Sequence, residues 1–168
     1  MIALGKIAGT LVAGCLSLCL TQQAASAGAP ATDMKKLAQL TGNWQGTGTY
    51  TWGKHSGTLK ATWRCRSGAG AAAVVCDFEV SGIEGLPEVI REVDLFGYDG
   101  EKKQVTWDWV CSIGGSHRYS GTFSGDRLEV SDASSRTVLT LTARRITIAY
   151  AASEEGGITL DLAMTRTK

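Results

Sequence analysis

The chain has 168 residues, with 17 basic and 16 acidic side chains and a hydrophobic content of 43%. The charges are scattered along the chain and form no basic tail or block, which makes nucleic acids and anionic membrane surfaces poor candidate partners. Two prolines against 21 glycines are typical of many strands joined by tight turns.

The first 27 residues have the pattern of a secretory signal peptide. Lys6 supplies the positive charge, residues 7–20 form an apolar segment, and Ala25-Ser26-Ala27 is a small-residue cleavage site. The apolar run is too short and too rich in small residues for a membrane span. We therefore expect cleavage after Ala27, a linker over residues 28–32, and one domain over residues 33–168 in the periplasm or outside the cell, without an integral membrane span.

A second interpretation of the same segment stays open. Leu11-Val12-Ala13-Gly14-Cys15 resembles a bacterial lipobox, in which Cys15 would carry the lipid and the protein would be an envelope lipoprotein. Cleavage there would leave a strongly apolar segment at the new N-terminus, and the apolar region before it would be about seven residues long, the lower limit for a signal. Cleavage after Ala27 is the favoured alternative.

A short helix is predicted to lead into the first strand. Residues 33–40 have apolar side chains at helical spacing, with Thr32 or Asp33 as the N-cap. Gly42 can adopt the positive φ that ends a helix. Trp44 then opens a stretch of alternating residues, as in a strand. A lone Gly-x-Trp motif more often marks an ordinary core aromatic, and it is the place of Trp44 at the head of a series of strands that gives the motif weight.

The rest of the chain predicts an all-β fold. Runs with strand character recur at intervals of about 8 to 12 residues, the spacing of sandwiches and barrels. The predicted strands are 44–53, 57–66, 73–82, 88–98, 103–112, 116–124, 127–133, 136–142, 144–151 and 157–167. The eighth and ninth could instead form one bent strand. The absence of a second predicted helix argues against parallel βαβ folds.

Three residue pairs predict the register of the second and third strands. If Cys65 lies opposite Cys76, then Trp63 meets Phe78 on the same face, and Arg64 meets Asp77 on the other. We therefore predict a Cys65–Cys76 disulfide, which in so short a loop would contribute about 2–3 kcal/mol. Cys111 would remain a buried, unreactive thiol.

A second hairpin is predicted to turn through residues 113–115. It would place Cys111 opposite His117, Trp109 opposite Tyr119, and Trp107 opposite Gly121. The glycine would leave room for the indole ring of Trp107.

Alternation gathers most aromatic side chains on one face of the sheet and the polar side chains on the other. The aromatic face is predicted to contain Trp44, Tyr50, Trp52, Trp63, Phe78, Trp107, Trp109, Tyr119 and Phe123, and the acids Asp77, Asp94, Asp108 and Glu129 are assigned to the polar face. With one short helix to cover it, such a face is buried most simply by closure. We expect an antiparallel up-and-down barrel of eight to ten strands, with an interior that is either filled or holds one ligand.

Four motifs resemble a family of secreted bacterial calycin-like proteins that is classed as a domain of unknown function. They are Leu37-x-x-Leu-x-Gly-x-Trp44, Leu95-Phe-Gly-Tyr-Asp99 with the following Lys-Lys-x-Val-x-Trp-x-Trp109, Tyr119-Ser-Gly-Thr-Phe-x-Gly-Asp126, and Met164-x-Arg166. The resemblance implies a barrel like those of lipocalins and fatty-acid-binding proteins, and it carries no settled activity. It also implies that Arg166 packs over Trp44 and closes one end.

The favoured function is binding of a small apolar ligand in the barrel. Trp107, Trp109 and Tyr119 would form apolar walls, and His117 would supply a polar contact near the rim. The alternatives are a filled barrel with a structural or interaction role in the envelope, and a haem-binding barrel like nitrobindin. No haem signature surrounds His55 or His117. The sequence contains no catalytic motif and no metal-ligand spacing, so we expect neither an enzyme nor a resident cofactor or metal.

Overall fold

The computed structural model describes residues 31–168, so the predicted signal peptide and the alternative lipidation of Cys15 lie outside the described residues. The described part opens with α1 (Ala31–Leu37), which continues as the 3-10 turn η1 (Ala38–Leu40). The helix thus begins two residues before the predicted start, within the predicted linker. Within residues 31–168, no helix has both the length and the apolar character needed to cross a membrane.

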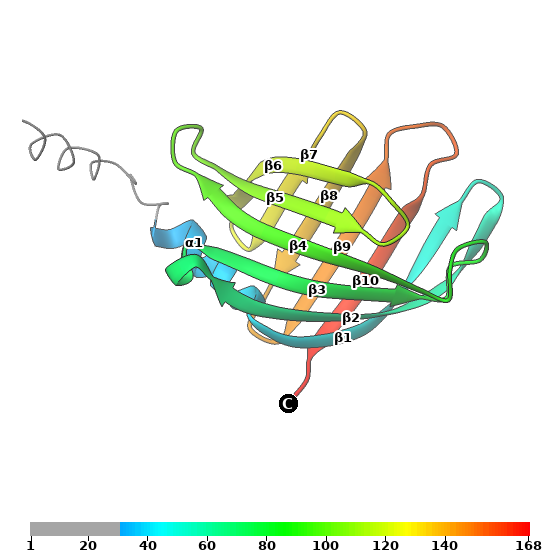
Figure 1. Cartoon of the computed structure of the whole chain (residues 1–168), viewed down its shortest axis with the longest axis horizontal. Coiled ribbons are helices and arrows are strands. Elements are labelled where there is room, and N and C mark those ends of the chain that lie inside the picture. The colour runs from blue at the N-terminus through cyan, green and yellow to red at the C-terminus, as the bar shows by residue number, and fades with distance from the viewer. Residues whose placement is uncertain (1–30) are drawn as a thin grey trace, which may run out of the picture.

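Ten antiparallel strands form one closed barrel (Figure 1). They are β1 (Gly42–Trp52), β2 (His55–Gly68), β3 (Ala73–Ser81), β4 (Val89–Asp99), β5 (Gln104–Cys111), β6 (Ser116–Ser124), β7 (Arg127–Ser131), β8 (Ser135–Leu141), β9 (Arg145–Ala152) and β10 (Thr159–Arg166). A short 3-10 turn, η2 (Ala69–Ala71), joins β2 to β3. Each strand pairs with its neighbours in sequence, and β1 pairs with β10 to close the sheet. The predicted all-β barrel is confirmed, and β8 and β9 are separate strands.

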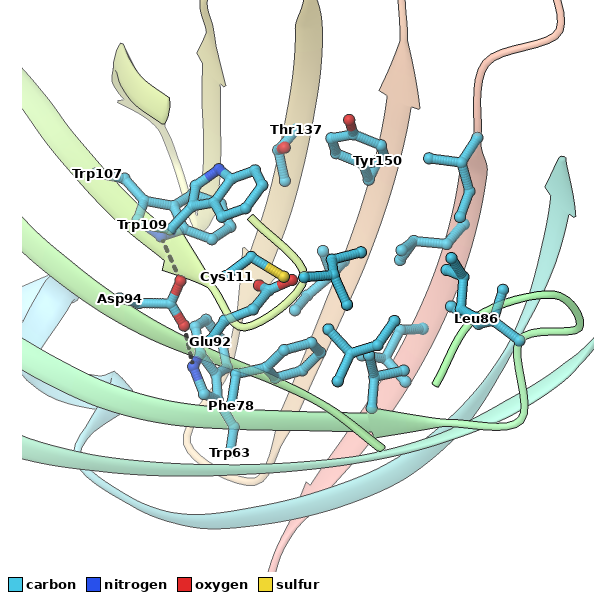
Figure 2. Close-up of a pocket in the computed structure, with 18 of the residues that line it drawn as sticks. Trp63, Phe78, Leu86, Glu92, Asp94, Trp107, Trp109, Cys111, Thr137 and Tyr150 are labelled. Carbon is cyan, nitrogen blue, oxygen red and sulfur yellow. Dashed lines mark hydrogen bonds between the residues drawn. The ribbon is translucent and has the colours of Figure 1, made fainter. Parts of the chain in front are cut away.

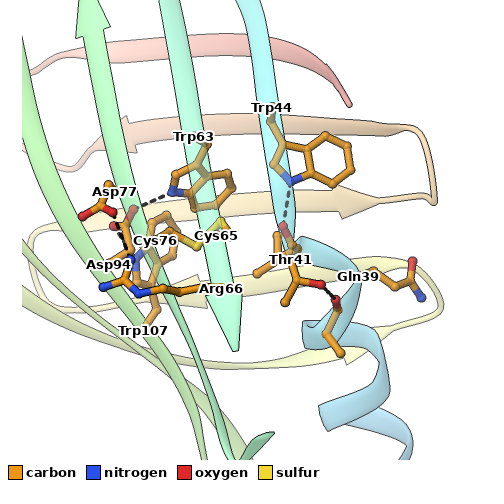
Figure 3. The surroundings of a disulfide bond; sticks show 12 residues. Gln39, Thr41, Trp44, Trp63, Cys65, Arg66, Cys76, Asp77, Asp94 and Trp107 are labelled. Carbon is orange, nitrogen blue, oxygen red and sulfur yellow. Dashed lines mark hydrogen bonds and ion pairs between the residues drawn. A yellow bond between two sulfur atoms is a disulfide. The ribbon is translucent and has the colours of Figure 1, made fainter. Parts of the chain in front are cut away.

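The predicted register of β2 and β3 is confirmed. Cys65 lies opposite Cys76 and forms the disulfide with it (Figure 3). Trp63 lies opposite Phe78. Arg64 also lies opposite Asp77, but the ion pairs run diagonally. Asp77 pairs with Arg66 at 3.0 Å, while Arg64 reaches Glu79 at 3.7 Å.

The predicted register of β5 and β6 is wrong by two residues. Trp107 lies opposite Tyr119 and Trp109 opposite His117, while Gly121 lies opposite Val105. The β5–β6 turn is centred on Ile113. Gly114 and Gly115, both at positive φ, lie between Ile113 and β6. A shift of two residues keeps every side chain on its predicted face. Gly121 lies where the backbones of β6 and β7 come close together, and a Cβ at this position would clash with the carbonyl oxygen of Glu129 on β7.

The helical segment and the end of β10 cover one end of the barrel, which we call the closed end. The indole nitrogen of Trp44 donates to the carbonyl of Leu40 at 2.6 Å. The guanidinium carbon of Arg166 lies 4.4 Å from the centroid of the Trp44 ring. Arg166 also donates to three backbone carbonyls, those of Gln39, Thr41 and Ala143. Gly42, at φ +127°, leaves space for this side chain, since a Cβ there would lie 2.5 Å from a guanidinium nitrogen.

Two predictions about the faces of the sheet need correction. Trp52, predicted to face inward, is 37% exposed because it is the last residue of β1, beside the β1–β2 turn. The outer face is not uniformly polar, because Val93 and Leu95 of β4 and Val110 of β5 point outward and are exposed. On β4, the opposite side chains, which include Asp94, point into the barrel.

Candidate functional site

A cavity of about 210 Å³ occupies the barrel interior (Figure 2). It extends from the middle of the barrel toward the end opposite Trp44, where the β3–β4, β5–β6 and β9–β10 connections contribute Ile83, Leu86, Ile113, Gly114 and Ile158 to its wall. We call this the open end. The other lining residues are Trp63, Phe78, Val80, Ile90, Glu92, Asp94, Trp107, Trp109, Cys111, Tyr119, Thr137, Ile148, Tyr150, Leu160 and Leu162. Most of the wall is therefore aromatic or aliphatic.

Tyr50 on β1 and His55 on β2 both hold the loop between β3 and β4 at the open end, and Nδ1 of His55 lies 3.3 Å from a carboxylate oxygen of Glu84. The hydroxyl of Tyr50, a buried residue of β1, accepts a hydrogen bond from the backbone N–H of Glu84 at 2.9 Å. Gly57 on the neighbouring β2 leaves room for the ring, since a Cβ there would lie 3.0 Å from it. These contacts place Ile83 and Leu86 against the cavity.

Three of the four residues predicted to line a ligand cavity lie on its wall. Trp107 stacks on Phe96 with ring centroids 4.8 Å apart, and the two rings of Trp107 and Tyr119 meet edge to face at 5.5 Å. The Tyr119 hydroxyl is 2.8 Å from the Ser135 hydroxyl. Trp109 is half-buried and lies closer to the open end. These contacts fix the rings, so the shape of the wall is set by packing within the barrel.

His117, the fourth predicted residue, is not part of the cavity wall. Its ring stacks on Trp109 at 4.8 Å, and its Nδ1 lies 2.5 Å from Oδ2 of Asp132. Burial raises the pKa of Asp132, but hydrogen bonds from His117 and from Ser134 and Ser135 outweigh burial and leave that pKa well below its usual value. His117 therefore supports Trp109 from behind instead of offering a polar contact to a ligand.

Asp132, His117 and Ser134 also have the composition of a catalytic triad, but their geometry differs from one. Ser134 Oγ lies 3.4 Å from Nδ1 of His117, the same ring nitrogen that contacts Asp132. A relay needs the nucleophile and the carboxylate on opposite ring nitrogens. The arrangement instead caps the β7–β8 turn, where Asp132 also accepts from the backbone N–H groups of Ser134 and Ser135.

The polar part of the cavity is formed by two acids on β4. Asp94 is 1% exposed, and its two oxygens accept one hydrogen bond each from Trp63 Nε1 at 2.7 Å and Trp107 Nε1 at 2.8 Å (Figure 3). Burial raises the pKa of Asp94 to about 7, against the lowering effect of the two indole hydrogen bonds. The prediction that Asp94 lies on the outer polar face is wrong.

Glu92 lies two residues before Asp94 and faces the same interior. Burial, together with the nearby charge of Asp94, raises the pKa of Glu92 to about 8. Cys111 lies opposite Glu92 in the β4–β5 register, and Figure 2 shows its sulfur beside the Glu92 carboxyl. Burial also raises the pKa of the Cys111 thiol. Glu92 is thus largely uncharged at neutral pH, and its hydrogen-bonding capacity is directed into the cavity.

Two further polar side chains lie on the wall formed by β8 and β9. Thr137 is 1% exposed, and its hydroxyl has no hydrogen-bond partner among residues 31–168. Tyr150 lies opposite Thr137 in the register of these strands, and burial raises its pKa. A buried hydroxyl without a partner is unusual and needs an explanation, such as a bound molecule.

The lining residues contain no lysine, arginine or histidine, so Glu92 and Asp94 face no cationic side chain of the described chain across the cavity. In the same part of the chain, no group of three or more His, Cys, Asp or Glu side chains is placed to hold a metal ion.

The fold is similar to that of a known structure. Neither the family models nor the curated proteins include a match to this chain. The crystal structure of Rv2717c from M. tuberculosis matches it with a TM-score of 0.65 and 12% sequence identity, over 83% of this chain and 99% of that one. At this identity the likeness supports a shared fold alone.

Sequence reasoning missed Glu92, Asp94, Thr137 and Tyr150. A signal for the two acids was available in the β4–β5 hairpin. Pairing Asp99 with Gln104 across the turn places Asp94 opposite the inward-facing Trp109, which would have assigned both acids to the interior. For Thr137 and Tyr150 the sequence offers no comparable signal, because threonine and tyrosine are common on either face of a sheet.

Proposed function

We propose that this protein is an exported barrel that binds one small, mainly apolar ligand in the cavity at its open end. The observation that carries the proposal is an unfilled interior with an aromatic and aliphatic wall. Sites for small molecules have this character, with a few polar groups that orient the ligand. We also propose a calycin-type relationship for the barrel, on the motifs around Trp44 and Arg166.

The volume restricts the size of the ligand. An apolar protein cavity of roughly 150 Å³ can hold benzene. A cavity of about 210 Å³ therefore suits one ring with a short chain, while longer ligands would have to extend through the open end.

Export is supported by two features of different kinds. The N-terminal segment has the pattern of a signal peptide, and the Cys65–Cys76 disulfide suits an oxidising compartment such as the periplasm or the cell exterior.

Calorimetric titration of the protein with 4-phenylbutanol, a neutral one-ring ligand, tests the proposed function. We expect saturable one-site binding and a change in tryptophan emission, because Trp63, Trp107 and Trp109 line the cavity. The ligand should also raise the melting temperature, as any ligand of the folded state does.

A matched pair of variants locates the binding. Leu160→Trp fills the cavity from β10 and should abolish binding, whereas Val110→Trp adds the same ring on the outer face, where Val110 is 60% exposed, and should leave binding intact. Thermal unfolding would verify that both variants fold. A flat titration of the unmodified protein would instead favour the filled barrel with a structural role.

A further inference from the structure

The polar groups of the cavity differ in whether their hydrogen-bonding capacity is already used within the protein. Both oxygens of Asp94 are occupied by the indole N–H groups of Trp63 and Trp107, and the Tyr119 hydroxyl is paired with Ser135. Glu92 faces the cavity beside Cys111, a weak donor (Figure 2), and no cationic side chain of residues 31–168 lines the cavity with it. Glu92 is therefore the ionisable group of the cavity wall that remains for a ligand.

The charge balance of the wall selects against anions. A carboxylate ligand would meet two acids and no basic side chain from the described residues, and a buried charge without a partner is very unfavourable. An ammonium group would instead meet two acids and no competing cation from the described residues. Glu92 would supply its counter-charge, and the aromatic rings of Phe78, Trp63 and Trp109 on the same cavity wall would present faces that attract cations.

We propose that the ligand is an amine with an apolar body, aryl or alkyl, whose ammonium group pairs with the Glu92 carboxylate inside the cavity. This inference rests on the proposed function and specifies the chemical class of its ligand. The hydroxyl of Thr137, which lines the cavity and has no hydrogen-bond partner within residues 31–168, is a second, independent sign that a molecule with a polar group binds in this space.

Binding of such an amine must be linked to release of a proton. Glu92 is faced by Asp94 on its own strand, by Phe78 on β3, by Cys111 on β5 and, across the interior, by Tyr150 on β9. With a pKa of about 8, Glu92 holds its proton in the free protein at pH 7 and would lose it on pairing with an ammonium group. We expect about one proton released for each amine bound at pH 7.

Three ligands that share a body and differ in charge test the proposal. They are 4-phenylbutylamine, 4-phenylbutanol and 4-phenylbutyrate, each titrated calorimetrically in two buffers of different ionisation enthalpy. We expect the amine to bind most tightly and with proton release, the alcohol to bind more weakly and without it, and the carboxylate to bind least. Amine affinity should rise by about tenfold per pH unit between pH 6 and 7.5, while alcohol affinity stays constant.

Glu92→Gln keeps the shape of the side chain and removes its charge. It should weaken amine binding at pH 8 by at least about tenfold, and it should weaken alcohol binding by a much smaller factor. Glu101→Gln, in the exposed turn between β4 and β5, is the control for loss of one negative charge. Proton release is measured on the unmodified protein, so this part of the test does not depend on folding of the variant.

The outcomes separate the inference from the proposed function. If the alcohol binds in the cavity but the amine binds no better, releases no proton or is indifferent to Glu92→Gln, the amine proposal is wrong and the apolar site stands. Preference for the carboxylate would overturn it equally. If none of the three ligands binds, the proposed function fails together with the inference.

Discussion

Asp94 connects its own strand, β4, to the neighbouring β5 and to β2, which is not a neighbour of β4 in the sheet. It lies on β4 and accepts hydrogen bonds from Trp63 on β2 and Trp107 on β5, so one side chain ties three strands together inside the barrel. The indoles are among the largest buried side chains of the protein, and a buried indole N–H requires an acceptor. The carboxyl thus serves packing first, and it shapes the cavity by fixing both rings.

Replacing Asp94 should therefore lower the free energy of unfolding, and the loss should grow with the number of hydrogen-bond acceptors removed. Asp94→Ala leaves two buried indole N–H groups without partners and should reduce the free energy of unfolding by about 3–5 kcal/mol. Asp94→Asn keeps one acceptor and removes a buried charge, so its loss should be smaller. Urea denaturation at pH 7 measures both, with Asp77→Asn on the outer face as the control. Equal losses for alanine and asparagine would contradict this role.

At the scale of strands, the register of a hairpin could be predicted only where several independent residue pairs agreed on it. For β2 and β3, the cysteines and the Trp63–Phe78 pair agree on a single register. For β5 and β6, the aromatic alternation alone is satisfied by any even shift, and the glycines of the turn admit more than one centre. The faces were therefore predictable, whereas the partners across that hairpin were not.

Strand β4 shows why the acids of the site escaped prediction. Its outward positions include Val93 and Leu95, and its inward positions include Glu92 and Asp94. Hydrophobic patterning assigns acids to solvent and valine to the core, which is the reverse of what this strand does. The hydrogen-bond donors of the Asp94 carboxyl lie on other strands, and those partners depend on tertiary pairing that the strand's own sequence does not contain.

One side chain of the last strand contributes several contacts to the helical segment before β1. Arg166 binds the carbonyls of Gln39 and Thr41 and covers Trp44. Arg166→Lys keeps the charge but loses the planar, multiply donating group, and we expect a loss of about 1–2 kcal/mol. Hydrogen exchange over residues 31–40 should accelerate more than exchange in β5. Arg145→Lys on the neighbouring strand is the control, and equal effects would contradict a specific closing role.

For the molecule as a whole, the two ends of the barrel differ in what fills them. The closed end is packed by Leu37, Leu40 and Trp44, all buried, whereas the open end retains a cavity whose polar groups are acids. The aromatic walls follow from alternation and were predictable. The cavity itself was not, because whether ten strands leave space depends on how the rings tilt, which the sequence pattern does not specify.

The buried acids give the protein an unusual dependence of stability on pH. Glu92 and Asp94 have pKa values of about 8 and 7 in the folded state, against ordinary values of 4.5 and 3.8. Below about pH 3 both acids are protonated whether the chain is folded or not. Between pH 4 and 8 the unfolded chain releases protons that the folded chain retains, so the free energy of unfolding falls as the pH rises. The contribution of Asp132 to stability depends on pH in the opposite direction. Its pKa is lowered in the folded state, so it stabilises the fold above pH 4, and that stabilisation is lost as the pH falls below 4.

We therefore expect maximal stability near pH 4, below the usual range, with a decline toward pH 8 and a plateau above about pH 9. Glu92→Gln removes one of the two groups responsible. Relative to the unmodified protein, its free energy of unfolding should rise between pH 5 and pH 8 by an amount on the order of 3 kcal/mol. Urea denaturation of both proteins from pH 4 to pH 9 measures the difference, with Glu101→Gln as the surface control. Parallel curves for the variant and the unmodified protein would mean that Glu92 ionises in the folded barrel as readily as in water, and the interior would then have to admit solvent to that depth.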